Sequence, residues 1–543
     1  MLSDTRDIQE LPFSPSLLTD APGNGPGDED TTDSRTSVAI LNATAKTTSL
    51  EFNELCMDYA NDLDLGQLWD IPSPLAGDSE LFSAFLSPAL ISADDKTIVL
   101  SEHYFSTVCP INSCFDSHHN PFRFFVRDLM GSSPLIHLVV MMVSASHICH
   151  IRNDMRSVAL KHRSEAIALL KEFNISSVNK KFEVVLSSIL LGMTSAWQDP
   201  TSLGLGHLRS SRTLFKEWSS DFDITTSMRS RSFIVGIMAY WEAMTSFLTT
   251  EGPANLKYLS PFYNQEHNDE IVYPNPWTGI STTLFIYAAE AGALCRQNRT
   301  MLALCSSTTS SLIRDEICVQ QFSEAAGLEK KVLHYSAPIL DRIEDCSDEH
   351  TPAHHFDCLA QIYRLSILLL LYITFPGLLG RNNEGNSIPP GIALQQSPQG
   401  SARQEIVSLA VSLLNVVSSA PESSGIKILL TFPLILAGSA LQKIPKAVPK
   451  RESASEIGYS RIVDEVLSIH CSDDVLLHWR SFVRQKLQSL HRHIALDPIL
   501  RAIQILDAVW LRADLSFSTN SDEASLVHWM DVMAEERLES IFG

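Results

Sequence analysis

The sequence predicts an all-α protein: an array of packed helical hairpins preceded by a disordered acidic N-terminal segment. Three observations support this class. The chain has 543 residues, of which 45% are hydrophobic and only 19% charged, so it contains enough apolar material for a large core. From about residue 96 onward apolar residues recur at helical spacing, and strand-like alternation is hard to find. Residues 1–80, in contrast, are acidic and rich in turn-forming residues.

The acidic segment is expected to cover residues 1–95, and the helical domain residues 96–543. Residues 1–80 hold 16 Asp and Glu against three basic residues, and include a turn-forming stretch at 22–30. Between Leu63 and Phe85, leucines and aromatic residues mix with acidic residues, which is typical of disordered activation segments. A tether that folds back onto the domain is the alternative.

The helical domain is predicted from amphipathic spacing. Ala159, Ala166, Leu170 and Phe173 stand at i, i+7, i+11 and i+14. This register leaves a polar group for the solvent side: Lys161, His162, Arg163 and Glu165. The same behaviour recurs in residues 182–197, 233–248, 284–294, 362–373, 406–417 and 502–510. Helices of this kind bury their apolar faces against one another, which predicts packed hairpins.

Two interruptions are the predicted internal loops: residues 381–403, rich in Gly, Pro, Ser and Asn, and residues 445–455, rich in Lys and Pro. The longest apolar runs, 135–151 and 365–379, fall short of the roughly 20 apolar residues that span a bilayer. We therefore expect buried helices there and no contact with a membrane.

Charge and cysteine usage restrict the function. The net charge of −22 disfavours broad attraction to nucleic-acid phosphates, so any DNA contact should be local or supplied by another subunit. The ten cysteines are scattered, and the first thirty residues lack a basic-then-apolar signal pattern, which indicates a reducing intracellular compartment.

Two glycine or histidine patterns are candidate binding motifs. Gly23, Gly25 and Gly27 are spaced like a phosphate-binding loop, but the acidic residues 28–30 that follow would repel a phosphate. His350, His354 and Cys358 would share one helix face and suit zinc, but Pro352 is expected to break that helix. An ordinary structural role is the preferred interpretation of both.

Two further groups have a structural and a functional interpretation. His147, Cys149 and His150 lie in an apolar helix, where core packing is expected rather than metal binding. The basic stretch of Lys443, Lys446, Lys450 and Arg451 is either a solvated loop, which we prefer, or a nuclear import signal.

Catalytic motifs are missing from the sequence. It contains no Gly-x-Ser-x-Gly elbow, no His-Glu-x-x-His and no P-loop with its lysine. The sequence therefore predicts a protein that is not an enzyme, with no catalytic, cofactor-binding or metal-binding residues and no cofactor.

A series of short blocks carries a family resemblance. In chain order these are His103-Tyr104-Phe105, Asn120-Pro121-Phe122-Arg123, Ser133-Pro134-Leu135-Ile136, Ser144-Ala145-Ser146-His147, His207-Leu208-Arg209 before Leu214-Phe215, Tyr240-Trp241, residues 275–281, residues 432–438, and Val509-Trp510 followed by Asp514 and His528-Trp529-Met530. The series, from about residue 96 to 543, resembles the regulatory domain of the fungal-specific transcription factors that carry a binuclear zinc cluster. Large buried aromatics with Pro and Gly punctuation are mostly packing determinants, so the blocks indicate a fold, and a function by analogy.

One departure from that family affects the functional interpretation. Its DNA-binding module needs six cysteines, arranged as two Cys-x-x-Cys pairs each followed by a third cysteine, whereas no Cys-x-x-Cys pair occurs here and only Cys56 precedes residue 100. Either an N-terminal portion is missing from this chain, or the protein is a domain-only member.

The resemblance implies a nuclear transcription regulator, of a metabolic or secondary-metabolite gene cluster, whose helical domain responds to effectors or partners. The implied partners are the transcription machinery, other regulators or a second copy of the chain, and DNA only if a zinc cluster outside this chain or a partner supplies the contact. The alternative is a domain-only helical scaffold or a cluster-encoded accessory protein, such as an enzyme, that does not bind DNA itself.

Overall fold

The computed structural model describes residues 93–172, 178–222, 227–263, 271–305, 311–379, 400–444, 472–519 and 525–542. The predicted all-α class is confirmed: within these residues the regular elements are helices, and β-pairing is limited to two isolated bridges, Val272 with Ile343 and Asn275 with Gly279. The predicted acidic segment lies outside the described residues except at its end, where the first described helix begins at Ala93.

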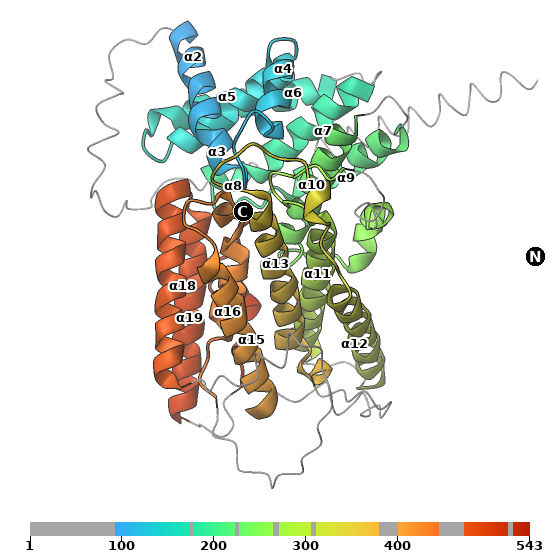
Figure 1. The fold of residues 1–543 in the computed structure, drawn as a ribbon, viewed down its shortest axis with the longest axis vertical. Helices are drawn as coiled ribbons and strands as arrows, with labels where there is room; N and C mark the ends of the chain where they lie inside the picture. The colour runs from blue at the N-terminus through green and yellow to red at the C-terminus, as the bar shows by residue number, and fades with distance from the viewer. Residues whose placement is uncertain are drawn as a thin grey trace, which may run out of the picture. The chain divides into compact units, whose positions relative to one another are not determined.

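The first group of helices is built around α5. Its members are α2 (Ala93–His103), the π-helix η1 (Tyr104–Val108), α3 (Cys109–Ile111), α4 (Pro121–Met130), α5 (Pro134–Ile148), α6 (Asp154–Glu172), α7 (Val178–Met193), α8 (Ser195–Gln198) and α9 (Leu205–Ser220). Helix α5 packs against α2, α4, α6 and α7, and α7 packs in turn against α9 (Figure 1). Because α5 is covered on several sides, it is apolar around most of its circumference, as the run 135–151 predicted.

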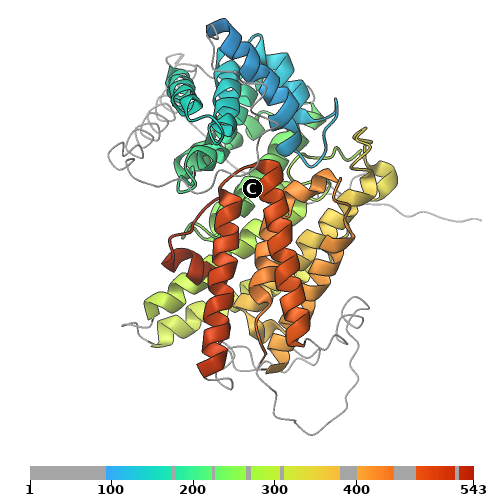
Figure 2. The ribbon, with the colours of Figure 1, turned by 90° about the vertical axis from the view of Figure 1, so that its left-hand side faces the viewer.

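The second group is a set of long helices side by side. Its members are α10 (Met228–Thr245), η2 (Pro253–Phe262), α11 (Thr282–Cys305), α12 (Ser311–Leu333), η3 (Leu340–Arg342), α13 (Ala353–Thr374), η4 (Pro376–Leu378), α15 (Gly400–Ser419), η5 (Gly425–Leu429), α16 (Thr431–Ala440), α18 (Asp473–Ile494), α19 (Pro498–Thr519) and α20 (Trp529–Glu535). Neighbours in sequence pack as hairpins, among them α10 with α11, α15 with α16 and α18 with α19 (Figure 2). The predicted array of hairpins is thus the observed arrangement.

Local sequence signals explain where several helices begin. The side chains of Asn120 and Ser133 accept hydrogen bonds from the backbone N–H groups of Phe122 and Ile136, at 3.0 and 3.2 Å. Each cap is followed by a proline at the first helical position, where a missing N–H costs nothing. These two Asn-Pro and Ser-Pro pairs therefore set the starts of α4 and α5.

The predicted helical segments lie in helices, with three differences from the prediction. The segment 233–248 continues three residues past the end of α10 at Thr245. The segment 182–197 is divided at Thr194 into α7 and α8. The predicted end of the loop 381–403 is wrong, because α15 already begins at Gly400. The first turn of a helix needs no apolar residue, so its polar sequence looked like loop. The rest of that loop, and the loop 445–455, lie outside the described residues.

In helix α6 the predicted apolar stripe is buried, but the residues predicted to face solvent do not all do so. Ala159, Ala166 and Leu170 are buried, while Phe173 lies outside the described residues. Lys161 is exposed as expected. Arg163, expected in solvent, points inward: its Nη2 lies 2.9 Å from Ser195 Oγ. The long aliphatic part of the arginine side chain lets its guanidinium reach the interior from the edge of the helix's apolar face.

Helix α13 is the one helix of the described residues long and apolar enough to cross a membrane by length and composition. The helix reaches this length because it extends back to Ala353, well before the apolar run, and the buried helix expected for that run is confirmed. Its most apolar window is 67% buried inside the fold, against α11, α12, α15 and α16. Packing in the interior accounts for its apolar composition.

Candidate functional site: a lysine-rimmed pocket

Several sequence blocks that carry the family resemblance lie where two elements of the fold pack together. The first such contact surrounds Asn275. Its Nδ2 donates to the carbonyl oxygens of Ser232 and Phe233, at 3.1 and 3.0 Å, and its Oδ1 accepts from the backbone N–H of Trp277 at 2.9 Å. A Cβ at Gly236 would lie 2.2 Å from the same amide. The block 275–281 thus fastens a turn to α10, which an asparagine can do because it both donates and accepts.

A second set of contacts holds α16 against α19 and α20. Trp510 Nε1 donates to the carbonyl oxygen of Gly438 at 2.8 Å, and a Cβ on that glycine would lie 2.9 Å from Leu506. Trp529 is fully buried, with its ring 5.2 Å from that of Phe247. The burial of both tryptophans, expected from the sequence, is confirmed. These blocks position the elements of the domain.

The histidines near residue 147 have different surroundings. His147 is buried between two partners: its Nδ1 is 2.9 Å from His103 Nε2, and its Nε2 is 3.1 Å from the carbonyl oxygen of Ile494. The expected satisfied core packing is confirmed for His147. His150 lies beyond the end of α5 at Ile148 and outside the core; its side chain is 20% exposed, 4.0 Å from the Asp497 carboxylate, while Cys149 is half-buried at the helix end.

The predicted break at Pro352 is confirmed, since α13 begins at Ala353. His350 therefore precedes the helix, and only His354 and Cys358 share it. Across the part of the chain that the structure describes, no three His, Cys, Asp or Glu side chains come together in a way that could hold a metal ion.

The other sequence candidates fall largely outside the described residues. This holds for Gly23, Gly25 and Gly27, and for Lys446, Lys450 and Arg451. Lys443 is described, and its Nζ lies 5.7 Å from the ring centroid of Phe517. That lysine is thus placed against the end of α19.

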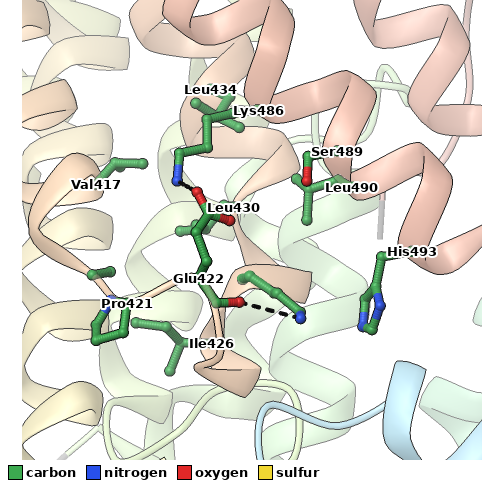
Figure 3. Close-up of a pocket in the computed structure, with 12 residues that line it drawn as sticks. Val417, Pro421, Glu422, Ile426, Leu430, Leu434, Lys486, Ser489, Leu490 and His493 are labelled. Atoms are coloured by element: carbon green, nitrogen blue, oxygen red, sulfur yellow. Dashed lines mark hydrogen bonds and ion pairs between the residues drawn. The ribbon is translucent and has the colours of Figure 1, made fainter.

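A pocket of about 250 Å³ lies where the end of α15 and η5 meet α16 and α18 (Figure 3). We call it the α15–α18 pocket. Its floor is apolar and buried, formed by Val417, Ile426, Leu430, Leu434 and Leu490. Because these side chains belong to four different elements that pack on one another, the floor is part of the core of the domain.

The rim of the pocket is polar and carries two lysines. Lys486 forms an ion pair with Glu422, and Lys427 Nζ donates to the backbone carbonyl oxygen of Glu422 at 3.3 Å (Figure 3). Ser489 and His493 complete the rim from α18. Burial against the fold, followed by the positive charge of Lys427, lowers the pKa of His493. The neutral form of this histidine is therefore favoured beside the lysines.

The wall that carries Glu422 is anchored from behind. The backbone N–H of Gly425 donates to Thr351 Oγ1 at 2.9 Å, and Ser424 Oγ accepts from the N–H of Ile426. A Cβ at Gly425 would lie only 2.4 Å from the carbonyl oxygen of Cys114. This close approach requires glycine, and it fixes the start of η5 while the side chain of Glu422 projects into solvent.

Comparison with known proteins supplies the family. The sequence profile of the fungal specific transcription factor domain matches residues 99–452 and 466–543. The chain belongs to this family. No zinc-cluster domain was matched in the chain. No curated protein and no solved structure matches the chain.

The fungal specific transcription factor domain contains the whole pocket, which sequence reasoning missed. Lys486, Ser489 and His493 stand at i, i+3 and i+7 of α18, a spacing that places them on one helix face. That signal was present in the sequence. Their juxtaposition with Lys427 and Glu422 was not, because it depends on how η5 and the segment before it pack beside α18, more than sixty residues away in the chain.

Proposed function

We propose that this protein regulates transcription in the nucleus, acting on a metabolic or secondary-metabolite gene cluster, and that residues 96–543 are its regulatory module. The observation that carries the proposal is the family match, which spans nearly all of that range. The fold is consistent with a module of this kind. The blocks that resemble the family hold helices together, and the α15–α18 pocket is left free to bind a small molecule.

In this role, contact with DNA would come from a zinc cluster outside this chain or from a partner protein. A net charge of −22 disfavours phosphate binding by the domain as a whole, since each phosphate contact needs a Lys or Arg to replace a counterion. We propose that regulators, the transcription machinery or a second copy of the chain are its partners, and that it neither catalyses a reaction nor carries a cofactor.

A tethering experiment tests the regulatory role. The full chain is fused to a DNA-binding module of known operator, and a reporter gene behind that operator is measured in a fungal host. We expect reporter output to change at least about threefold relative to the module alone, and the fusion to accumulate in the nucleus. A fusion that is abundant and nuclear but leaves output unchanged would support the scaffold or accessory role instead.

Deleting the gene and sequencing the RNA of the deletion strain tests which genes the protein regulates. A cluster regulator should change a contiguous set of genes, with the rest of the transcriptome largely unaffected. Unchanged transcripts accompanied by loss of a metabolite would contradict the proposal, because they would place the protein in the chemistry of the pathway.

A further inference from the structure

We propose that the α15–α18 pocket binds a small organic acid of about ten non-hydrogen atoms, whose anionic group takes the place of the Glu422 carboxylate on Lys486. This inference rests on the proposed function, in which residues 96–543 are a regulatory module with a pocket free to bind a small molecule. It adds the chemical class of the ligand and the residues that recognise it.

The ion pair at the rim indicates where the anion binds. The side chain of Lys486 is only 16% exposed and is held along α18, whereas that of Glu422 is 69% exposed. The cation is therefore positioned by the fold, and the carboxylate is the exchangeable partner. Ion pairs with an exposed member contribute little to stability, so a ligand carboxylate that also gains apolar contacts can displace Glu422.

A second cation stands beside the first. Within the described residues, Lys427 Nζ donates a hydrogen bond to a neutral carbonyl oxygen, that of Glu422, at 3.3 Å, which is a weak partner for an ammonium group. Because both lysines line the pocket, a carboxylate bound to Lys486 would also experience the positive charge of Lys427. Since the whole chain carries a net charge of −22, this locally positive rim is a selective feature.

The floor and the volume of the pocket define the polarity and size of the rest of the ligand. The five apolar side chains of the floor offer no hydrogen bonds, so the part of the ligand that enters must be apolar. A dry apolar cavity of about 150 Å³ accommodates benzene, so a pocket of about 250 Å³ holds roughly ten non-hydrogen atoms. An aryl or branched alkyl acid meets both requirements.

Binding would also act on the contact between two elements. Among the ion pairs of the described residues, the one between Glu422 and Lys486 joins the segment after α15 to α18. A ligand that replaces Glu422 removes this ion pair and fills the space between η5 and α18. The same exchange therefore couples recognition of the acid to the packing of α18, as a regulatory module requires.

Three probes of nearly equal size test the class of ligand. Phenylacetate, phenylacetamide and phenethylamine share an aryl group and differ in charge. Each is titrated into the full-length protein, with binding followed by calorimetry and by the shift in melting temperature. We expect phenylacetate to bind with Kd of about 1 mM or tighter, at least about fivefold tighter than phenylacetamide, and phenethylamine not to bind.

Variants locate the site. We expect Lys486→Gln to weaken phenylacetate binding at least about fivefold, and Glu422→Gln to strengthen it about two- to fivefold, since the competing carboxylate is removed. Lys181→Gln is the matched control: Lys181 pairs with Asp221 at a distant place with a similarly covered side chain, 19% exposed, and its loss should leave binding unchanged.

Several outcomes would overturn the inference. They are equal affinity for the acid and the amide, no binding of either at 10 mM, or phenylacetate binding that Lys486→Gln leaves intact. The tethered reporter separates this inference from the proposed function. Reporter activity without any acid binding would reject the pocket and retain the regulator, and acid binding without reporter activity would retain the pocket and reject the regulator.

Discussion

At the residue scale, a histidine pair joins α2 and α5 to the end of α18. His147 contacts both His103 and the backbone of Ile494, at the end of α18. Burial, followed by the nearby His147, lowers the pKa of His103 to about 4, and burial also lowers the pKa of His147. Both rings are therefore neutral near pH 7, so the pair is a hydrogen-bonded contact that protonation would disrupt.

This pair predicts acid sensitivity. The unfolded chain takes up the proton of His103 near pH 6.5 and the folded chain only near pH 4, so its contribution to stability is present above pH 6.5 and is lost as pH falls toward 4. After allowance for the partial exposure of the ring, we expect a loss of about 1 kcal/mol at pH 5. Urea unfolding at pH 7.5 and 5.0 measures it.

His103→Gln is the control for this prediction. The amide of glutamine keeps a donor for His147 but does not titrate, so the variant should lose less stability between the two pH values than the wild type. Equal losses would show that other groups cause the acid sensitivity.

A second residue-scale prediction concerns Trp510, which is 7% exposed, donates to Gly438 and lies 5.5 Å from the guanidinium of Arg480. Trp510→Ala should lower the free energy of unfolding by about 3–5 kcal/mol. Trp510→Phe, which keeps a ring but leaves the Gly438 carbonyl without its donor, should cost about 1–3 kcal/mol. Denaturant unfolding measures both.

In cells, Trp510→Ala should reduce soluble protein and reporter output together, because the residue acts on function through stability. Normal abundance with lost output would instead identify Trp510 as a partner contact and would move the functional surface to the C-terminal helices.

At the element scale, two helical glycines have opposite surroundings. A Cβ at Gly192 in α7 would lie 2.3 Å from the ring of Trp241 in α10. A Cβ at Gly327 in α12 would meet nothing within 4 Å. Close approach of α7 and α10 therefore depends on the first glycine, while the second only weakens its own helix.

The pair makes a matched prediction. Gly192→Ala should destabilise the protein by about 1–3 kcal/mol through overpacking. Gly327→Ala should stabilise it by about 0.5–1 kcal/mol, because alanine has the higher helix propensity. Thermal unfolding of both variants against the wild type measures the sign. Two shifts of the same sign would contradict the assigned contacts.

How much the sequence predicted also depends on scale. Helical periodicity located elements such as α10, α13 and α19, because a buried stripe is a local property of the chain. It missed the start of α15 at Gly400, because the first turn of that helix has no large apolar residue. The meeting of Lys486 with Glu422 could not be predicted, since spacing along one helix does not reveal which segment packs beside it.

At the scale of the whole molecule, the division of the chain at residue 95 remains a prediction. Residues 1–80 are strongly acidic and lack helical apolar periodicity, and the first described helix begins at Ala93. Deleting residues 1–90 should therefore change the melting temperature by no more than about 2 °C. A fall of many degrees would show that this segment packs on the domain.

The final prediction concerns zinc and DNA. The chain has no Cys-x-x-Cys pair and a net charge of −22, so the purified protein should not retain zinc and should not shift promoter DNA by itself. Metal analysis after gel filtration and a mobility-shift assay at about 50 mM salt, where phosphate contacts are strongest, measure the two properties. The control is the same chain fused to a six-cysteine zinc module, which should bind two zinc ions and shift DNA in a salt-sensitive way. Stoichiometric zinc together with sequence-specific DNA binding by the unfused chain would contradict the prediction. Such a result would require a metal site within the residues printed above, and DNA recognition by a surface whose overall charge opposes it.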